Sequence, residues 1–573
     1  MTSEPRENAP RPAPSFLTSL VSGRLPLEML LDFPEEDAAE ERASDKVAAE
    51  VLGLLTERLD PEELDRTREI PAGLLEEVRA RGFFSLRDEP ALGGLGLSDF
   101  GTFRVLERAA GWSVTLGQLL AIQNVIGVGI LLPALPPGSE LEALVRRHVR
   151  DVTFSGFASS EPTGQNNSWP ATTAVPTEDG SAYVLDGEKL FIGNAPLAGI
   201  LAVAATIRDG EEPRSGVFFV ETDTPGFSRT SRIEFMGSHG LPIGGVRLEG
   251  VRVPAAHVLT GGPDNVRLPA RVMAIALLSA FFSNAAPALG VARQCLDGMR
   301  AFVGRRAIDG RGLIEYDAVQ RRLAATRAEI FAMDAMVRWS FLGADPMGRM
   351  FEHLVGKNIT TRAAWEIADR TVAVLGGEGF ETAESKSRRG AVPFPAERLL
   401  RDARALRVSG NVDFMIDIQA GRLLLSRFRP DGPALPPLEE PAELPDAGLS
   451  AANADHLRAA AHDIRRLAHT CAGLVRRHPD PAELFAREET LILLSQVSSE
   501  LLTICAALAR ARRAPAGQDL ADAYCTAARV RLLGLWARLT ADREPDYGRI
   551  SRGPAEDEPR AQAAAPTPTV AEH

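Results

Sequence analysis

The sequence contains few cysteines, and no two of them lie close together. The 573 residues include only Cys295, Cys471, Cys505 and Cys525, and none belongs to a CxxC pair. A disulfide framework and a cysteine-bound zinc site are therefore not expected. This composition is typical of a protein in a reducing compartment, and we predict a cytoplasmic location.

The signatures of several large enzyme classes are also missing. The sequence has no GxSxG nucleophile elbow, no P-loop and no GxGxxG dinucleotide motif. Its histidines do not show HExxH or comparable spacing, so we predict no metal site. These absences argue against a hydrolase of the elbow type, a P-loop nucleotidase and a zinc enzyme.

Positive charge and long uninterrupted apolar runs are scarce as well. The 64 Lys and Arg residues are outnumbered by 77 Asp and Glu residues, which gives a formal net charge of −13. This balance argues against nucleic acid as a partner.

The N-terminus MTSEPRENAPRPAP has no apolar core of the signal-peptide kind. The apolar stretch 272–291 is interrupted by Ser279, Ser283, Asn284 and Pro287. We therefore expect a buried helix there and no integral membrane segment.

Hydrophobic periodicity divides the chain into successive regions. Apolar residues recur at three- and four-residue spacing before about residue 144 and again after about residue 268, whereas short β-prone runs separated by turns lie between. Six prolines in 429–445 exclude a long helix. The predicted regions are a disordered segment 1–15, an N-terminal helical domain 16–150, a middle β domain 151–260, a C-terminal helical bundle 261–428, a Pro-rich linker 429–449, an extra helical domain 450–545 and a disordered tail 546–573.

Within the β region, Asp186-Gly187 separates two apolar runs. This dipeptide is typical of a two-residue hairpin turn, and we predict a hairpin at this place. The fold class that we predict is mainly α with a central β domain. In order, it comprises an N-terminal helical bundle, an antiparallel β-barrel or sandwich, a C-terminal four-helix bundle and an extra helical domain.

Short motifs between residues 70 and 425 resemble those of the acyl-CoA dehydrogenase flavoproteins, and they occur in the family's order. They are Gly93-Gly94-Leu95-Gly96, Ser160-Glu161-Pro162, Leu185 to Asn194, Met236-Gly237, Val251-Arg252-Val253-Pro254, Leu375 to Phe380 and Glu397 to Arg404. The complete set predicts the family's fold. The extra helical domain is similar in position and helical character to that of the very-long-chain branch.

The resemblance implies a flavoprotein oxidoreductase. In the family, FAD lies between the β domain and the C-terminal bundle, a glutamate removes the α-proton of an acyl thioester, and the β-hydrogen leaves to the flavin. This chemistry needs a carboxylate beside the α-carbon and donors on the thioester carbonyl. The resemblance therefore implies FAD as cofactor, an acyl thioester carried by CoA or by an acyl carrier protein as substrate, and a homodimer.

The catalytic glutamate of the family is missing from this sequence. Counting from Arg401-Asp402-Ala403-Arg404, the usual base position falls on Gly410. The alternative position, on the first long helix of the bundle, falls on Ala280. We take Asp413 and Glu378 as weak candidates for a replacement base, and a solvated or capping role is the alternative interpretation of Asp413.

The cofactor contacts that the resemblance implies are also altered. The candidates are Phe157, Ser159, Ser160, Gln165, Phe191, Gly193, Arg306, Gly376 and Gly377. Gly193 stands where the family has a threonine near flavin N5, and Phe191 replaces a tryptophan. Arg306 belongs to an element that the family lends to the FAD of a neighbouring subunit, and Asp309 replaces the aromatic residue of that element.

Two hypotheses about function stay open. The first is an FAD-dependent oxidoreductase of acyl thioesters in specialised metabolism, including flavin-dependent hydroxylation, for which oxygen activation needs no α-proton abstraction. The second is a flavin-free or catalytically silent member of the fold, acting as a redox-neutral enzyme or as a partner subunit. Resemblance of fold does not decide between them, because function resides in the site.

Overall fold

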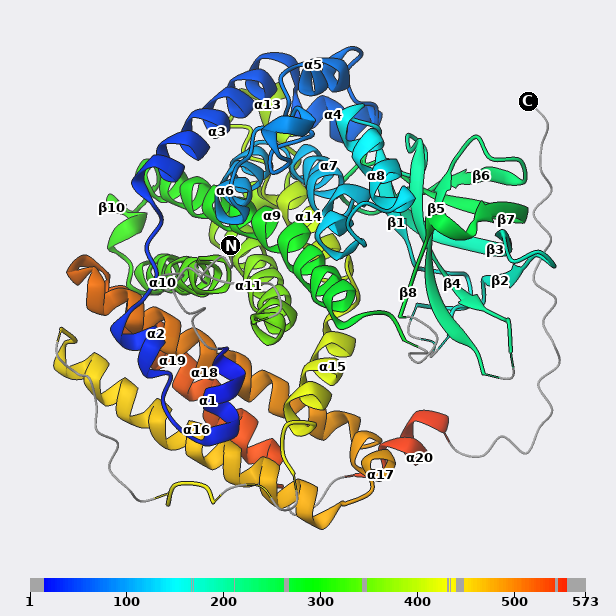
Figure 1. The fold of residues 1–573 in the computed structure, drawn as a ribbon. Coiled ribbons are helices and arrows are strands. Elements are labelled where there is room, and N and C mark those ends of the chain that lie inside the picture. The colour runs from blue at the N-terminus through cyan, green and yellow to red at the C-terminus, as the bar shows by residue number, and fades with distance from the viewer. Residues whose placement is uncertain are drawn as a thin grey trace, which may run out of the picture.

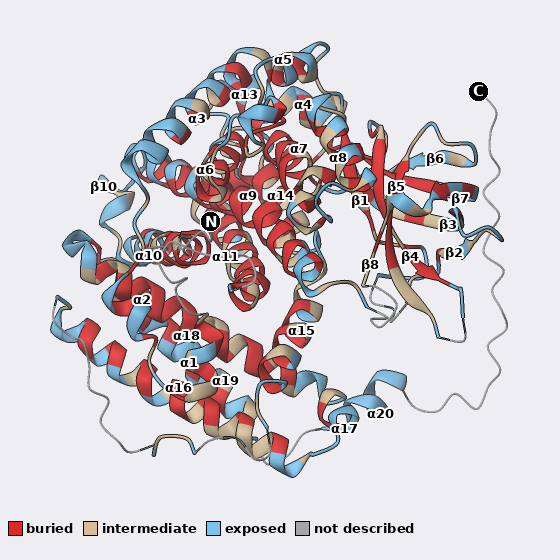
Figure 2. Ribbon diagram, in the orientation of Figure 1, coloured by how far each residue is buried: buried red, intermediate tan, exposed pale blue. Residues whose placement is uncertain are grey.

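A computed structural model describes residues 15–165, 167, 169–210, 212–261, 267–342, 348–429, 432, 434–438, 448–541 and 545–553. Helices precede and follow a single β domain, which lies at one side of the molecule (Figure 1). The buried residues are concentrated in the helices at the centre and in the strands of the β domain (Figure 2). The predicted fold class is confirmed.

Side-chain caps fix the first turns of the helices in the first helical domain. Asp37, Asp60, Ser98, Ser113 and Ser139 each accept a hydrogen bond from a backbone N–H in the first turn of the helix that follows, which fixes where these helices begin. The helices are α3 (Ala38–Arg58), α4 (Pro61–Thr67), α5 (Leu74–Ala80), α6 (Asp99–Ala110), α7 (Val114–Val125) and α8 (Glu140–Arg150), with 3₁₀ turns η1 (Pro90–Leu92) and η2 (Val128–Ala134).

The two N-terminal helices do not pack on the first helical domain, where the sequence placed them. The sequence assigns 16–150 to one helical domain, but α1 (Phe16–Ser22) packs on α16 and α11, and α2 (Leu27–Leu31) packs on α18. Glu352 of α11 accepts hydrogen bonds from the backbone N–H of Phe16, at 2.6 Å, and from the hydroxyl of Ser15, at 2.9 Å. Short helices bury a small apolar face, and periodicity does not reveal which surface covers it.

The β domain is one eight-stranded sheet with the order β6-β7-β3-β2-β4-β5-β8, and β1 also pairs with β4. Most pairs are antiparallel, but β1 and β2 run parallel to β4. The strands are β1 (Ser155–Ala158), β2 (Thr173–Pro176), β3 (Ala182–Gly193), β4 (Ile200–Ile207), β5 (Arg214–Glu221), β6 (Phe227–Arg232), β7 (Ile243–Pro254) and β8 (Val258–Thr260), with the 3₁₀ turn η3 (Ala255–His257) before β8.

The predicted hairpin at Asp186-Gly187 is wrong. Both residues lie inside the continuous strand β3, at a register shift in its pairing with β7. A side chain on Gly187 would come within 2.6 Å of Thr172 Oγ1, and its φ is +154°. Glycine is therefore required by close packing at a β-bulge, which gives the same sequence signal as a turn.

The C-terminal bundle surrounds the long helix α9 (Ala270–Arg305). Its other helices are α10 (Asp317–Phe341), α11 (Met350–Leu375), α12 (Gly377–Phe380), α13 (Ala383–Arg388), α14 (Ala396–Leu406) and α15 (Asp413–Leu425). A small hairpin of β9 (Ala307–Ile308) and β10 (Arg311–Gly312) and the turn η4 (Leu313–Glu315) connect α9 to α10.

The extra domain packs on this bundle through α18 and α19. It contains α16 (Ala451–Arg477), α17 (Pro481–Phe485), α18 (Glu488–Arg513), the turn η5 (Pro515–Gly517), α19 (Gln518–Leu539) and α20 (Tyr547–Arg552). Buried Asp334 of α10 pairs with Arg510 of α18 at 2.6 Å and with Arg293 of α9 at 3.0 Å, so an ionic cluster spans the contact. Helix α20 falls in the predicted disordered tail 546–573, so that prediction is wrong for Tyr547–Arg552. The rest of the tail after residue 553 lies outside the described residues, as do residues 1–14 and most of the predicted linker.

Among the residues that the structure describes, three helical stretches are long and apolar enough to cross a membrane, judged by length and composition alone. They are Val114–Ala134, Ala270–Arg305 and Glu488–Arg513, and 83%, 78% and 78% of their most apolar windows are buried inside the protein. These helices are apolar on most sides because other helices surround them in the bundle.

Candidate functional site

The two positions at which the family places its base face one point in the structure. Gly410 lies in the loop between α14 and α15 with φ +67°, and Ala280 lies on α9. A Cβ built on Gly410 would lie 3.2 Å from Ala280 Cβ and 3.1 Å from Asn284 Nδ2. Two positions that are 130 residues apart in the sequence therefore converge, and neither carries an acid.

The polar group at this point is the carboxamide of Asn284. Its side chain is fully buried, and Nδ2 donates to the carbonyl oxygen of Ala280 at 2.8 Å and to Ser283 Oγ at 3.3 Å. Within the described part of the chain, Asn284 Oδ1 has no hydrogen-bond partner. A carboxamide accepts and donates hydrogen bonds but does not remove a carbon-bound proton. The sequence had marked Asn284 only as an interruption of an apolar run.

Asp413 is near this loop in sequence, but its carboxylate is engaged by arginines. It accepts hydrogen bonds from Arg407 Nε at 2.9 Å and from Arg362 Nε at 3.4 Å. Burial raises the pKa of Asp413, but the hydrogen bond from Arg407 and the charge of Arg362 outweigh it and hold the pKa below its usual range. Asp413 lines a cavity of about 660 Å³ between α10, α11, α18 and α19.

Glu378, the second candidate for a replacement base, lies at the far end of α9. It accepts charged hydrogen bonds from Arg305 at 2.7 Å and from Arg306 at 3.2 Å. Along α9, 25 residues separate Ala280 from Arg305, since 305 − 280 = 25, which corresponds to roughly 38 Å. Glu378 is therefore far from Gly410 along the bundle, and the carboxylate of Asp413 is engaged by Arg407 and Arg362.

A buried lysine fixes the loop that carries Gly410. Lys357 of α11 donates to the carbonyl oxygens of Arg407 at 3.0 Å and Asn411 at 2.8 Å. Burial lowers the pKa of Lys357 to about 7. Sequence reasoning missed this residue, because a lysine inside a helix has no local signal that distinguishes it from a solvated one.

The β domain is attached to the bundle next to this loop. Ser238 donates through its backbone N–H to Asp402 Oδ1 at 2.6 Å and through Oγ to Gln118 Oε1 at 2.6 Å. Arg401 donates to the carbonyl oxygen of Met236 at 3.1 Å. The β6–β7 connection is thereby held against α14, which leads into the Gly410 loop.

Two of the predicted cofactor contacts, Phe191 and Gly193, lie at the end of β3. Phe191 has φ +61° and is 53% exposed, and its ring stacks with that of Phe235 at a centroid distance of 6.3 Å. A side chain on Gly193 would come within 3.1 Å of Ile122 of α7. Ile122 therefore fills the space that a threonine at position 193 would require.

The predicted contacts Phe157, Ser159, Ser160 and Gln165 lie in and after β1. The buried ion pair between Lys189 and Glu161, at 2.7 Å, anchors this segment, and Lys189 also donates to the carbonyl oxygen of Ser159 at 3.3 Å. Ser160 Oγ donates to Gln165 Oε1 at 3.3 Å. These four residues belong to the same domain as Phe191 and Gly193.

Arg306, Gly376 and Gly377 form a second group at the opposite end of α9. A Cβ on Gly376 or Gly377 would meet nothing within 4 Å, and Gly376 has φ +59°. The β domain lies on the right in Figure 1, whereas β10, which adjoins this group, lies on the left. One chain thus presents the predicted cofactor contacts in two separate places.

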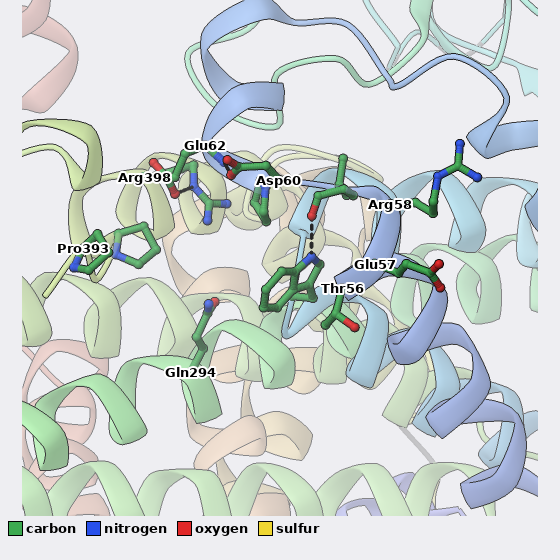
Figure 3. Close-up of a pocket in the computed structure, with 12 residues that line it drawn as sticks. Thr56, Glu57, Arg58, Asp60, Glu62, Gln294, Pro393 and Arg398 are labelled. Atoms are coloured by element: carbon green, nitrogen blue, oxygen red, sulfur yellow. Dashed lines mark hydrogen bonds and ion pairs between the residues drawn. The ribbon is translucent and has the colours of Figure 1, made fainter. Parts of the chain in front are cut away.

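A further cavity of about 500 Å³ contains none of the predicted site residues (Figure 3). It lies between α3, α4, α9 and the segment before α14. The Trp112 indole donates to the carbonyl oxygen of Leu59 at 3.1 Å, and Arg398 pairs with Glu62 at 2.9 Å. Two of its charged wall groups, Arg398 and Glu62, are thus paired with each other.

Comparisons with known proteins agree with this architecture. A crystal structure from Bacillus anthracis, described as an acyl-CoA dehydrogenase complexed with FAD, aligns with a TM-score of 0.70 at 18% identity, over 93% of this chain and 94% of that chain. The helix–β–helix arrangement is therefore that of the acyl-CoA dehydrogenase fold. The family models "Acyl-CoA dehydrogenase, middle domain" and "Acyl-CoA dehydrogenase, C-terminal domain" match residues 156–251 and 271–424. Over these two regions the chain matches the acyl-CoA dehydrogenase family.

Two relatives match different shares of this chain. Probable acyl-CoA dehydrogenase FadE10 of Mycobacterium tuberculosis is 29% identical over 92% of this chain and 86% of its own length. Benzylmalonyl-CoA dehydrogenase of Aromatoleum aromaticum is 29% identical over 63% of this chain and 92% of its own length. The match to FadE10 extends across most of the chain, whereas the second relative covers a smaller share of it.

Proposed function

We propose that this protein is an FAD-dependent oxidoreductase of acyl thioesters that works without the family's catalytic glutamate. The observation that carries the proposal is the uncovered aromatic surface at the end of β3. Phe191, Phe235 and Met236 are 53%, 37% and 61% exposed, next to the connection that holds the β domain on α14. Apolar surface of this kind is typical of a ligand-binding face.

The residues present fit FAD. Phe191 and Phe235 offer an aromatic face to a flat ring, Ser159 and Ser160 offer hydroxyl groups, and Gly376 lets the backbone approach a diphosphate without a side chain in the way. When bound, FAD supplies a two-electron acceptor. Several relatives carry names or titles that refer to acyl-CoA substrates or FAD, which supports the same assignment.

The separation of the two groups of contacts supports a homodimer. The Arg306 group lies at the C-terminal end of α9, roughly 38 Å along the helix from Ala280, whereas the other contacts belong to the β domain. A second copy that brings its Arg306, Gly376 and Gly377 to the β domain of the first completes each site. We expect a dimer in solution, measured by size exclusion with light scattering. A monomer that retains FAD through repeated dilution would contradict this arrangement.

The thioester is carried by CoA or by an acyl carrier protein, and the chain's own residues have defined tasks toward it. The Lys357 hydrogen bonds hold the Gly410 loop, and Asn284 and Ala280 bound the point beside the α-carbon. The relative named benzylmalonyl-CoA dehydrogenase has a substrate name that describes a thioester with a carboxylate on its α-carbon.

A flavin-free enzyme or a silent partner subunit is the second candidate. It is favoured by Gly193, whose side-chain space is filled by Ile122, and by Asp309, which adds a negative charge close to Arg306. Flavin-dependent hydroxylation is a variant of the first candidate, since it needs no base at Gly410.

The visible absorption spectrum of the freshly purified protein, followed by heat release and mass identification of any chromophore, separates these candidates. One FAD per chain, bleached anaerobically by an acyl thioester, is the expected result. A colourless protein that does not bind added FAD would refute both the dehydrogenase and the hydroxylase.

A further inference from the structure

The cavity between α3, α4, α9 and the segment before α14 contains a hydrogen-bond acceptor without a partner (Figure 3). Gln294 of α9 lines this cavity, and its Oε1 is buried with no donor among the residues that the structure describes. In Figure 3 the Gln294 side chain points from α9 toward the side on which Asp60 and Arg398 lie. A buried oxygen without a donor costs free energy, which a ligand that donates a hydrogen bond would recover.

The charges in the wall of this cavity favour a positive ligand. Both arginines of the wall already have glutamate partners. These pairs are Arg58 with Glu77 and Arg398 with Glu62, the latter at 2.9 Å. Two further wall carboxylates, Glu57 and Asp60, form no ion pair within the described part of the chain. An anion would therefore meet guanidinium groups that are already paired, whereas a cation gains carboxylates that lack a positive partner.

Asp60 is held in place at the cavity by its role as a helix cap. Its Oδ1 accepts hydrogen bonds from the backbone N–H groups of Glu62, at 2.9 Å, and Glu63, at 3.4 Å. These bonds fix the first turn of α4 and use one of the two carboxylate oxygens. The carboxylate is thus positioned before a ligand arrives, which lowers the entropic cost of binding.

The rest of the wall is apolar and includes one aromatic ring. Trp112 lines the cavity together with Leu59, Pro61, Pro393 and Pro395. The Trp112 indole N–H donates to the carbonyl oxygen of Leu59 at 3.1 Å, so the ring is fixed and its donor is already used. Tryptophan is the side chain that attracts cations most strongly through its π-system. A volume of about 500 Å³ is typical of a site for a small organic molecule.

We propose that this cavity binds a small organic amine, with a primary ammonium group on an apolar body. The ammonium group donates hydrogen bonds to Gln294 Oε1 and to the Asp60 carboxylate. The apolar body lies against Trp112 and the proline rings. The inference goes beyond the proposed function, because the cavity contains neither Gly410 and Ala280 nor any predicted flavin contact.

Isothermal titration calorimetry of the full-length protein tests the ligand class. Phenethylamine is compared with 2-phenylethanol, 3-phenylpropionate and trimethyl(2-phenylethyl)ammonium, which have a similar apolar body. Phenethylamine should bind at least about tenfold more tightly than each of the others, because it alone combines a positive charge with N–H donors. Equal binding of the quaternary compound, tighter binding of 3-phenylpropionate, or a Kd for phenethylamine weaker than ~1 mM would overturn the proposal.

Matched variants locate the site. Gln294→Leu removes the acceptor and should weaken phenethylamine binding at least about tenfold. Asp60→Asn keeps the cap of α4 but removes the charge, and should weaken binding roughly two- to fivefold. Gln320→Leu, at an exposed position of α10, and Asp37→Asn, the same change in the cap of α3, should leave binding unchanged.

The variants are first compared by thermal unfolding without ligand. If Gln294→Leu does not fold, the pair Asp60→Asn and Asp37→Asn decides the question alone. Phenethylamine binding that is unchanged in every folded cavity variant would overturn the placement at Gln294 and Asp60. Because the readout is the heat of binding and not flavin chemistry, the result is independent of the flavoprotein assignment.

Discussion

The two ends of α9 differ in what they retain. At the Ala280 end, both acid positions of the family are neutral, and Asn284 is the buried polar group beside them. At the Arg305 end, Arg305 and Arg306 still form ion pairs with Glu378 beside two open glycines. One helix therefore has neutral side chains at one end and a charged surface at the other.

The largest effect is expected from an acid at the Ala280 end. Ala280→Glu should raise anaerobic flavin bleaching by butyryl-CoA by roughly 10²- to 10⁴-fold, which is the usual contribution of a positioned general base. Stopped-flow absorbance measures this rate. Equal rates in Ala280→Glu and in the control Ala276→Glu, at an exposed position one turn earlier on α9, would contradict the placement of the α-carbon beside Ala280.

A side chain at Gly410 is expected to reduce stability. Gly410 has φ +67°, and a Cβ there would lie 3.1–3.2 Å from Asn284 and Ala280, so Gly410→Glu and Gly410→Ala should each lower the free energy of unfolding by about 1–3 kcal/mol. Urea denaturation measures the loss. Gly53→Ala, in α3 where a Cβ meets nothing, should instead be stabilising by ~0.5–1 kcal/mol. A Gly410→Glu variant as stable as the wild type would show that this loop is not constrained by α9.

A smaller effect is expected at the Arg305 end. Arg306→Ala should weaken FAD binding roughly fivefold, corresponding to ~1 kcal/mol for a partly exposed charge. Arg300→Ala, on the same helix and paired with Asp297, should leave FAD affinity unchanged. Equilibrium dialysis of FAD compares the two variants. Equal affinities would remove Arg306 from the cofactor site.

The smallest expected effect is a pH dependence of stability from Lys357. Its pKa is lowered from 10.5 to about 7, so between these values the unfolded chain binds the proton and the folded chain does not. Stability therefore rises with pH above about 7, with a slope of at most ~1.4 kcal/mol per pH unit, and the burial penalty is fully present below pH 7.

Lys357→Met should lose this rise, whereas Lys46→Met, at an exposed position of α3, should keep it. Urea denaturation at several pH values from 6 to about 9 provides the comparison. A wild-type profile that is flat over this range would exclude a buried, partly deprotonated Lys357.

The order of regions and the family motifs could be predicted from the sequence, because helical and strand periodicities are local properties. The positions Gly410 and Ala280 were also located by counting from motifs. That they face one point could not be predicted, since it depends on the packing of α9 against a loop 130 residues away. The ion pairs of Asp413 could not be predicted either, because its partners Arg362 and Arg407 belong to other elements.

Other features gave a misleading local signal. Gly187 resembles a turn residue, but it is required by the approach of Thr172 inside β3. The apolar faces of α1 and α2 could be recognised in the sequence. The helices that cover them, α16 and α18, lie more than 400 residues later in the chain. Sequence patterns indicate that a face is buried and leave the covering element open.

If the protein provides no base for the α-proton, it does not catalyse exchange of this proton with D₂O. The protein is incubated with butyryl-CoA in D₂O under anaerobic conditions, and deuterium at the α-carbon is measured by mass spectrometry. We predict exchange at the uncatalysed rate for the wild type and rapid exchange for Ala280→Glu. Rapid exchange by the wild type would show that a base lies beside the α-carbon, which Gly410, Ala280 and Asn284 do not provide.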